Sequence, residues 1–317
     1  MHALSDLDYL TKLRDWNPPQ WFLNAMSTNR KRGTVQVDGS DISYFQWGNP
    51  NKPGVVLTHG FMAHSRCWAF VAPLLAHKYH LVAFDLSGMG DSGWRTDYSF
   101  DSRAREAVLV AEHAGMLASA HKPSLICHSY GGSVGMAAVE QNDGVFDNLI
   151  ICDLMMVKPG DTHHRDRHEK RKKRGVRPHR VYETIEAARQ RFRLAPEQPC
   201  SNDYLVDYLA FHSIKRSQHG WIWKFDPSIL ADDTERSADW WTGLASRFAN
   251  LAIPKAFIYG QHSQLFGDEV ANYLESLAPQ PFPIVRVPNA YHHIMLDEPI
   301  ALAASLDSLL QSLHSNE

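Results

Sequence analysis

The sequence predicts an α/β fold in which helices flank a mostly parallel sheet. Six short runs rich in β-branched residues lack alternation between apolar and polar positions, at residues 54–60, 80–86, 124–129, 148–154, 255–260 and 282–288. Such runs are typical of strands that are buried on both faces. Helix-length segments, such as residues 100–119, separate most of them. Strands alternating with helices predict βαβ units and a parallel sheet.

Two elements are predicted before the first of these strands. In residues 5–16, apolar positions share one helical face and Ser5 with Asp8 resembles a capping box, which predicts a short helix. Residues 33–48 alternate around an Asp-Gly-Ser turn and predict a β-hairpin.

Size and composition suit a globular protein with one large domain or a core with an inserted subdomain. The chain has 317 residues, 44% of them hydrophobic, and a net charge of −3. This balance does not favour nucleic acid or an anionic membrane as a partner. The four cysteines show no metal-binding spacing, so no metal or other cofactor is predicted. No secretory signal pattern and no apolar run near the ~20 residues of a spanning helix are found, which predicts a cytoplasmic protein without stable membrane insertion. The oligomeric state is not indicated.

The interval 155–230 interrupts the strand–helix rhythm. It predicts a mainly helical cap, or lid, inserted into a core made of residues 1–154 and 231–317. The most basic stretch, residues 163–180, fits a solvated lid helix, a site for an anionic substrate group or a patch that binds nucleic acid or anionic lipid. We favour the solvated helix because the chain is slightly acidic overall. Trp221 and Trp223 are candidates for the wall of an apolar pocket.

A serine lies at a sharp strand-to-helix junction. Residues 127–131 read CHSYG, close to the G-x-S-x-G nucleophile elbow, with Cys127 in place of the first glycine. A Gly-rich turn that only caps a helix is the alternative interpretation. If Ser129 is a nucleophile, the backbone amides of Phe61, in the run LTHGF, and of Tyr130 are placed to bind an oxyanion.

Four motifs in order carry a resemblance over nearly the whole chain: HGF, D-x-x-G-x-G-x-S, H-S-Y-G-G and H-x-x-x-x-D-x-P. The chain resembles the α/β-hydrolase superfamily, in its branch of capped, esterase- and lipase-like serine hydrolases. The resemblance implies that Ser129 is the nucleophile. It also implies that the base is the histidine seven residues before Pro299, which is His292, with His293 as the lesser candidate.

The triad acid departs from the family pattern. The family most often places it just after the strand at 255–260, where this chain has Ser263 and Gln264. A triad histidine needs a carboxylate to fix its tautomer and stabilise its charged form. Asp153, at the end of the strand in 148–154, is favoured over Asp268, which is expected in the first turn of a helix. A hydrogen bond of about 2.6–3.2 Å between Asp153 and His292 is predicted.

These residues predict a serine hydrolase that cleaves small apolar or aromatic carboxylic esters through an acyl-enzyme. Lactones, thioesters and certain C–C bonds are alternatives for the same triad. Epoxide hydrolysis and dehalogenation are disfavoured, because those relatives need a carboxylate where Ser129 stands. A non-catalytic binding protein on a retired hydrolase fold is the alternative from a different class.

Overall fold

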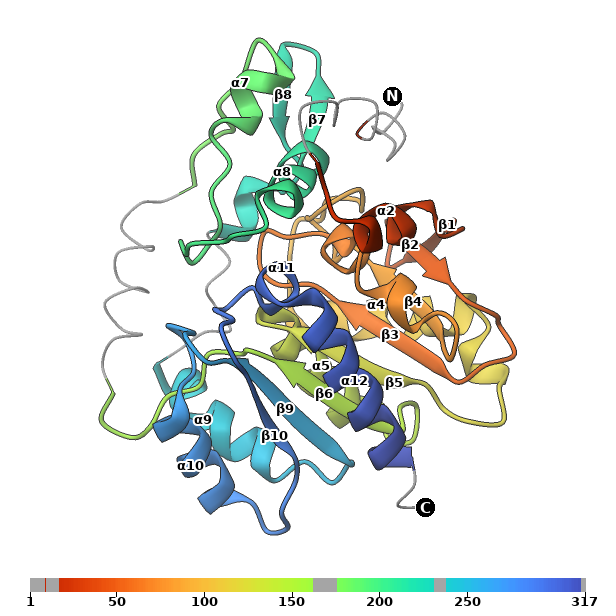
Figure 1. Cartoon of the computed structure of the whole chain (residues 1–317), viewed down its shortest axis with the longest axis vertical. Coiled ribbons are helices and arrows are strands. Elements are labelled where there is room, and N and C mark those ends of the chain that lie inside the picture. Colours follow the sequence, from red (N-terminus) through yellow and green to blue (C-terminus); the bar gives the residue numbers. More distant parts are fainter. Residues whose placement is uncertain (1–8, 10–16, 162–175, 231–237, 315–317) are drawn as a thin grey trace.

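A computed structural model describes residue 9 and residues 17–161, 176–230 and 238–314. Within these residues, eight strands form one sheet in the order β1-β2-β4-β3-β5-β6-β9-β10 (Figure 1). The strands are β1 (Lys31–Val37), β2 (Ser40–Trp47), β3 (Gly54–Thr58), β4 (His80–Phe84), β5 (Ser124–His128), β6 (Asn148–Cys152), β9 (Lys255–Gly260) and β10 (Ile284–Val287). Strand β2 is antiparallel to both neighbours and all other pairings are parallel. The predicted fold class is confirmed.

The predicted hairpin is formed by β1 and β2, with Val37 opposite Ser40. Its two turn residues, Asp38 (φ 47°) and Gly39 (φ 77°), are both left-handed, as a type I′ turn requires. The helix predicted at residues 5–16 lies outside the described residues except for the buried Tyr9.

Five of the six runs predicted as doubly buried strands bury both faces, whereas β10, at the edge of the sheet, is only partly buried and exposes Arg286. In β3, Val55 and Leu57 belong to one apolar cluster while Val56 belongs to the other. The same division continues in β5, where Ile126 faces one side and Leu125 the other. Every residue of β3, β4, β5, β6 and β9 is buried, so these strands hold the centre of the fold rigidly.

Helices cover both faces of this sheet. One cluster is built with α2 (Gln20–Ser27), α3 (Ala72–Leu75), α11 (Ile294–Asp297), α12 (Pro299–His314) and the 3₁₀ turn η2 (Ser65–Trp68). The other is built with α4 (Phe100–His113), α5 (Tyr130–Gln141), α9 (Ala238–Ala249), α10 (Asp268–Leu277) and the 3₁₀ turn η3 (Met116–Ala118). The side chain of Ser99 caps α4 by accepting the amide of Ser102.

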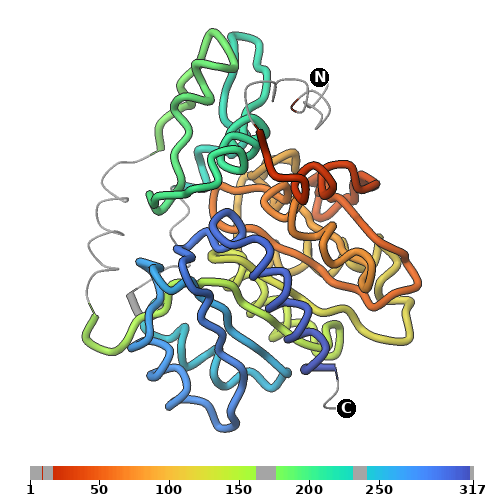
Figure 2. The backbone as a smooth tube through the Cα atoms, in the orientation of Figure 1, coloured from red at the N-terminus to blue at the C-terminus, as the bar shows by residue number. Residues whose placement is uncertain are grey.

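The segment between β6 and β9 contains α7 (Ile185–Arg189), α8 (Asp203–His212), β7 (Ile214–Ser217), β8 (Gly220–Trp223) and the 3₁₀ turn η4 (Pro227–Leu230). The β7–β8 hairpin was not expected from the helical prediction. Figures 1 and 2 show α7, α8 and this hairpin together at one end of the molecule, beyond the sheet. Helix α8 packs on the core through Tyr208, whose ring lies 6.2 Å from that of Phe70.

Most of the basic run lies outside the described residues, including residues 171–174. Its described end is largely exposed, with Arg177 and Arg180 both in contact with solvent. Among the described helices, none is both long and apolar enough to cross a membrane.

Candidate active site

Ser129 stands at the junction between β5 and α5. Its backbone has φ 51° and ψ −123°, a conformation that non-glycine residues rarely adopt. The amide of Ser129 donates to the carbonyl of Cys152 on β6 at 2.8 Å, and its carbonyl accepts the amide of Gly132 at 2.7 Å. The side chain is partly exposed, whereas both flanking residues are buried. The fold therefore projects the Ser129 hydroxyl from a fixed, strained turn.

Small residues allow the turn to pack this tightly. A Cβ added to Gly131 would lie 2.5 Å from Thr58 Oγ1 and 2.6 Å from the carbonyl oxygen of His59. A Cβ at Gly135 would lie 2.5 Å from the sulphur of Cys127. The missing side chain of Gly135 thus makes room for Cys127, which replaces the usual first glycine of the elbow.

A carboxylate lies against the predicted base. Asp153 directly follows β6, and its Oδ1 lies 2.8 Å from Nδ1 of His292, in the loop after β10. Both side chains are buried, with 0% of Asp153 and 3% of the His292 side chain exposed. The distance falls in the range predicted from the sequence. Because Nδ1 donates to a carboxylate, Nε2 of His292 carries the lone pair.

Two further donors hold the Asp153 carboxylate in place. The amide of Gly260 donates to Oδ2 at 2.9 Å, and the hydroxyl of Ser263 donates to Oδ1 at 2.6 Å. Asp153 itself has φ 54°, a left-handed conformation that aspartate tolerates better than most residues. In the sequence, Ser263 was noted only because it occupies the position where the family usually has its acid. In the structure, its hydroxyl binds Asp153, the carboxylate that lies against His292 instead.

The His292 ring lies beside the elbow. Its centroid is 4.8 Å from that of His128, the residue before Ser129, and His128 Nε2 is 3.0 Å from the carbonyl oxygen of His292. Burial, reinforced by the nearby His292, lowers the pKa of His128 to about 3. His128 is therefore neutral and donates its Nε2 proton to that carbonyl, which ties the histidine loop to β5. Sequence reasoning missed this role of His128.

The predicted oxyanion residues meet at the same place. The rings of Phe61 and Tyr130 are 5.4 Å apart, and a Cβ at Gly60 would lie 3.2 Å from Cβ of Ser129. The amide of Tyr130 belongs to the first turn of α5, where N–H groups point toward the helix N-terminus. The loop after β3, which carries Gly60 and Phe61, is held by His59, whose Nδ1 lies 2.7 Å from the carbonyl oxygen of Gly60.

The alternative acid lies elsewhere. Asp268 begins α10 and accepts the hydroxyl of Tyr259 at 2.6 Å, while its other oxygen pairs with Arg286 at 2.9 Å. Both oxygens of the Asp268 carboxylate are thus bound by Tyr259 and Arg286, and neither is given a contact with His292. Asp268 is exposed at the surface of α10, as expected for an acid in the first turn of a helix.

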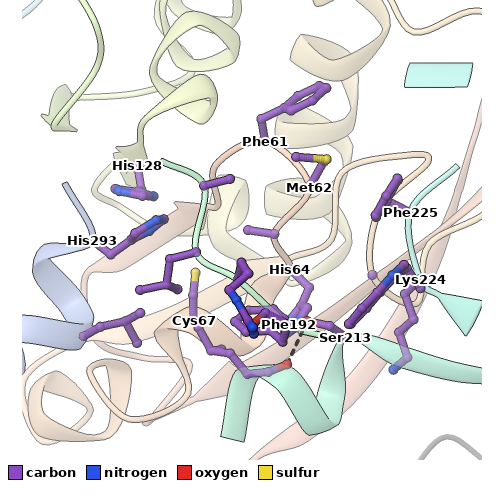
Figure 3. Close-up of a pocket in the computed structure, with 18 of the residues that line it drawn as sticks. Phe61, Met62, His64, Cys67, His128, Phe192, Ser213, Lys224, Phe225 and His293 are labelled. Carbon is purple, nitrogen blue, oxygen red and sulfur yellow. Dashed lines mark hydrogen bonds between the residues drawn. The ribbon is translucent and has the colours of Figure 1, made fainter. Parts of the chain in front are cut away.

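A cavity of about 260 Å³ opens next to the histidines (Figure 3). His128 and His293 form one end of its wall. Most of the remaining lining is apolar or aromatic, including Phe61, Met62, Phe192, Trp223 and Phe225. Figure 3 shows His128 and His293 at the left, Phe61 and Met62 above and Phe225 at the right. The segment between β6 and β9 thus contributes part of the wall, through α8, β8 and the loops that follow α7, α8 and β8.

Polar groups in this wall are mostly paired within the protein. Lys224 forms an ion pair with Asp91 at 2.6 Å, and Asp91 also pairs with Arg66 at 3.1 Å. His64 Nε2 lies 3.0 Å from the hydroxyl of Ser213. Both tryptophans were predicted in the wall, and Trp223 lines the cavity as predicted. Trp221 is not among the lining residues, and its backbone pairs with that of Tyr182.

Comparison with known proteins identifies relatives of this fold. The model of the alpha/beta hydrolase family matches residues 55–305. The uncharacterised hydrolase YugF of Bacillus subtilis is 28% identical over 117 residues, which cover 36% of this chain and 41% of that protein. A soluble epoxide hydrolase of Corynebacterium is 30% identical over 141 residues, which cover 43% of this chain and 47% of that protein. The matches thus span less than half the length of these curated relatives.

Solved structures extend the likeness over most of the chain. The crystal structure of E-2-(acetamidomethylene)succinate hydrolase superposes with a TM-score of 0.73, at 18% identity, covering 89% of this chain and 100% of that one. At this level of identity the likeness concerns the fold.

Proposed function

The chain belongs to the alpha/beta hydrolase family, and we propose that it is a serine hydrolase that cleaves carboxylic esters of small molecules through an acyl-enzyme. The observation that carries the proposal is the 2.8 Å contact between His292 Nδ1 and Asp153 Oδ1 beside a strained, partly exposed serine. A buried carboxylate on one imidazole nitrogen leaves the other nitrogen as a base.

In the proposed first step, Ser129 Oγ attacks the ester carbonyl carbon while His292 Nε2 takes the hydroxyl proton. The Asp153 carboxylate holds the imidazole in the required tautomer and stabilises the imidazolium that forms. The imidazolium then gives its proton to the departing alkoxide, which leaves as an alcohol. In the second step, water attacks the acyl-enzyme with His292 again as the base, which releases the acid and restores Ser129.

The negative charge on the carbonyl oxygen needs donors that are already in place. The amides of Phe61 and Tyr130 are assigned this role in the proposal, supported by the approach of Gly60 to Ser129 and by the first-turn position of Tyr130. The hydrogen bond from His59 to the Gly60 carbonyl supports the fixed orientation of this loop.

An apolar or aromatic ester fits the cavity best. The lining is mainly apolar, with aromatic rings among its residues, and its buried cation, Lys224, is neutralised by Asp91. A volume of about 260 Å³ suits a compact acyl or aryl group. In this proposal residues 155–230 act as the cap, because Phe192, Trp223 and Phe225 face the cavity from that segment.

Lactones, thioesters and activated C–C bonds remain alternatives for the same residues. The relation to an epoxide hydrolase favours a second mechanism, in which a carboxylate is the nucleophile. This chain has a serine at that junction, which supports the serine mechanism. The retired-fold alternative predicts no turnover of any of these substrates.

The experiment is steady-state hydrolysis of p-nitrophenyl acetate and butyrate, a phenyl thioester and styrene oxide by the wild type and by Ser129→Ala. We expect ester turnover by the wild type and its loss in Ser129→Ala, with an unchanged circular dichroism spectrum. Ser276→Ala, at an exposed position of α10, is the matched control. Near-wild-type ester turnover by Ser129→Ala would contradict the proposal.

A further inference from the structure

Three imidazoles meet at the end of the cavity. The ring centroids of His128 and His293 are 5.7 Å apart, and that of His292 lies 4.8 Å and 4.9 Å from the two. One nitrogen from each ring can be chosen so that the three atoms lie within 4.8 Å of one another. Among the described residues, this is the group of His, Cys, Asp and Glu side chains close enough to share a metal ion.

Each imidazole already has an acceptor for one N–H. His292 Nδ1 faces the Asp153 carboxylate, and His128 Nε2 faces the backbone carbonyl of His292. His293 has a backbone partner at Pro196, while its Nε2 is buried and has no hydrogen-bond partner. The partner of Pro196 is therefore Nδ1. An outer acceptor on one nitrogen is the arrangement that metal-binding histidines usually show, because it fixes the tautomer with a lone pair on the other nitrogen.

The unpartnered nitrogen is an unusual feature of this site. A buried acceptor without a donor costs free energy, and His293, which carries this buried nitrogen, is one of the residues that line the cavity.

We propose that His128, His292 and His293 form an inhibitory site for a transition-metal dication such as Zn²⁺, Cu²⁺ or Ni²⁺. Imidazole nitrogens suit these ions, whereas Mg²⁺ and Ca²⁺ prefer oxygen ligands. Nitrogens in a tetrahedral zinc site lie about 3.3 Å apart. The three rings therefore need to close inward when the ion binds, and the Asp153 carboxylate behind His292 offsets part of the charge of the ion.

Binding would stop catalysis by a direct route. The Nε2 lone pair of His292 that accepts the Ser129 proton is the same one that a metal ion would take. Inhibition rests on the proposed function, whereas metal binding does not. No Cys/His spacing in the sequence indicates this cluster, because β5 and the histidine loop come together across 164 positions.

The direct test is a titration of the purified protein with Co²⁺ as a spectroscopic probe, compared with His293→Gln. Tetrahedral nitrogen ligation gives Co²⁺ visible absorption bands, so this measurement needs no activity. We expect these bands in the wild type and their loss in His293→Gln. His262→Gln, which removes an exposed histidine, is the control for surface binding and should retain the bands.

The parallel test is ester hydrolysis in the presence of Zn²⁺, with each variant compared with its own metal-free rate. We expect micromolar Zn²⁺ to inhibit the wild type, chelator to restore activity and Mg²⁺ to have no effect. The Zn²⁺ concentration for half-inhibition should rise at least about tenfold in His293→Gln. Equal Zn²⁺ sensitivity of wild type and His293→Gln, or the same Co²⁺ bands in both, would overturn the site. An inactive wild type that still shows the bands would instead contradict the proposed function.

Discussion

Asp153→Asn tests the acid of the proposed triad with almost no change in shape. In the wild type, Asp153 Oδ2 accepts the amide of Gly260 while Oδ1 accepts the hydroxyl of Ser263 and faces His292 Nδ1. The asparagine must keep its oxygen toward Gly260, because the opposite orientation places two N–H donors together in a buried site, at a cost of about 1–3 kcal/mol.

The asparagine NH₂ group then faces His292 Nδ1. A donor at this position favours the tautomer with the proton on Nε2, so the imidazole cannot accept the proton of Ser129. Loss of the triad acid in this way lowers kcat about 10⁴-fold, which corresponds to about 5.4 kcal/mol of activation free energy. The assay is p-nitrophenyl butyrate hydrolysis at pH 7.5, with a thermal melt to show that Asp153→Asn is folded.

A second substitution makes this test sharper. Ser263 Oγ lies 2.6 Å from the oxygen of Asp153 that faces His292, so Ser263→Asp brings a carboxylate to the customary family position. We expect the double variant Asp153→Asn/Ser263→Asp to recover part of the lost activity, by about tenfold or more. Asp268→Asn is the matched control and should retain nearly full activity. A kcat of Asp153→Asn within tenfold of the wild type, or an equal loss in Asp268→Asn, would refute the reasoning.

Two further predictions concern buried histidines. His292→Ala should lower kcat by several orders of magnitude and His293→Ala by far less, measured on the same ester; the reverse order would assign the base to His293. Burial, followed by the charge of Lys224, lowers the pKa of His64 well below 6.5, so the unfolded chain binds a proton there that the folded chain does not. This component of stability is present above pH 6.5 and lost as the pH falls, by about 1.4 kcal/mol between pH 7.5 and 5.5. Urea unfolding at pH 7.5 and 5.5 measures how much free energy of unfolding each protein loses as the pH falls. The loss in His64→Asn should be smaller than in the wild type by about 1.4 kcal/mol, and that in His262→Asn should equal the wild-type loss. Equal losses in the wild type and both variants would contradict the prediction.

The sheet and the positions of the strand ends could be predicted from the sequence. Strands that are buried on both faces have a composition of their own, and residues at the carboxyl ends of parallel strands lie at one edge of the sheet. Asp153 was therefore expected near the histidine loop, and the structure places it 2.8 Å from His292. The catalytic roles of these residues remain predictions.

Other features depend on contacts that the sequence does not announce. The supporting hydroxyl of Ser263 meets Asp153 only because the loop after β9 turns back over the end of β6. His128 contacts His292 across β5 and the loop after β10. The β7–β8 hairpin was not predicted because each strand has only four residues and neither shows a clear alternation of apolar and polar positions. The first strand contains Lys215 and Arg216, and the second reads Gly-Trp-Ile-Trp.

The most direct test of the central claim is covalent labelling with a fluorophosphonate, followed by tandem mass spectrometry of the labelled peptide. The phosphorus is attacked by an activated serine, so the account predicts one label, on Ser129. Labelling should be lost in Ser129→Ala and strongly slowed in His292→Ala, because Ser129 then lacks its base. An ester-hydrolysing protein that is labelled at another residue, or not at all, would contradict the assignment of Ser129 as the nucleophile.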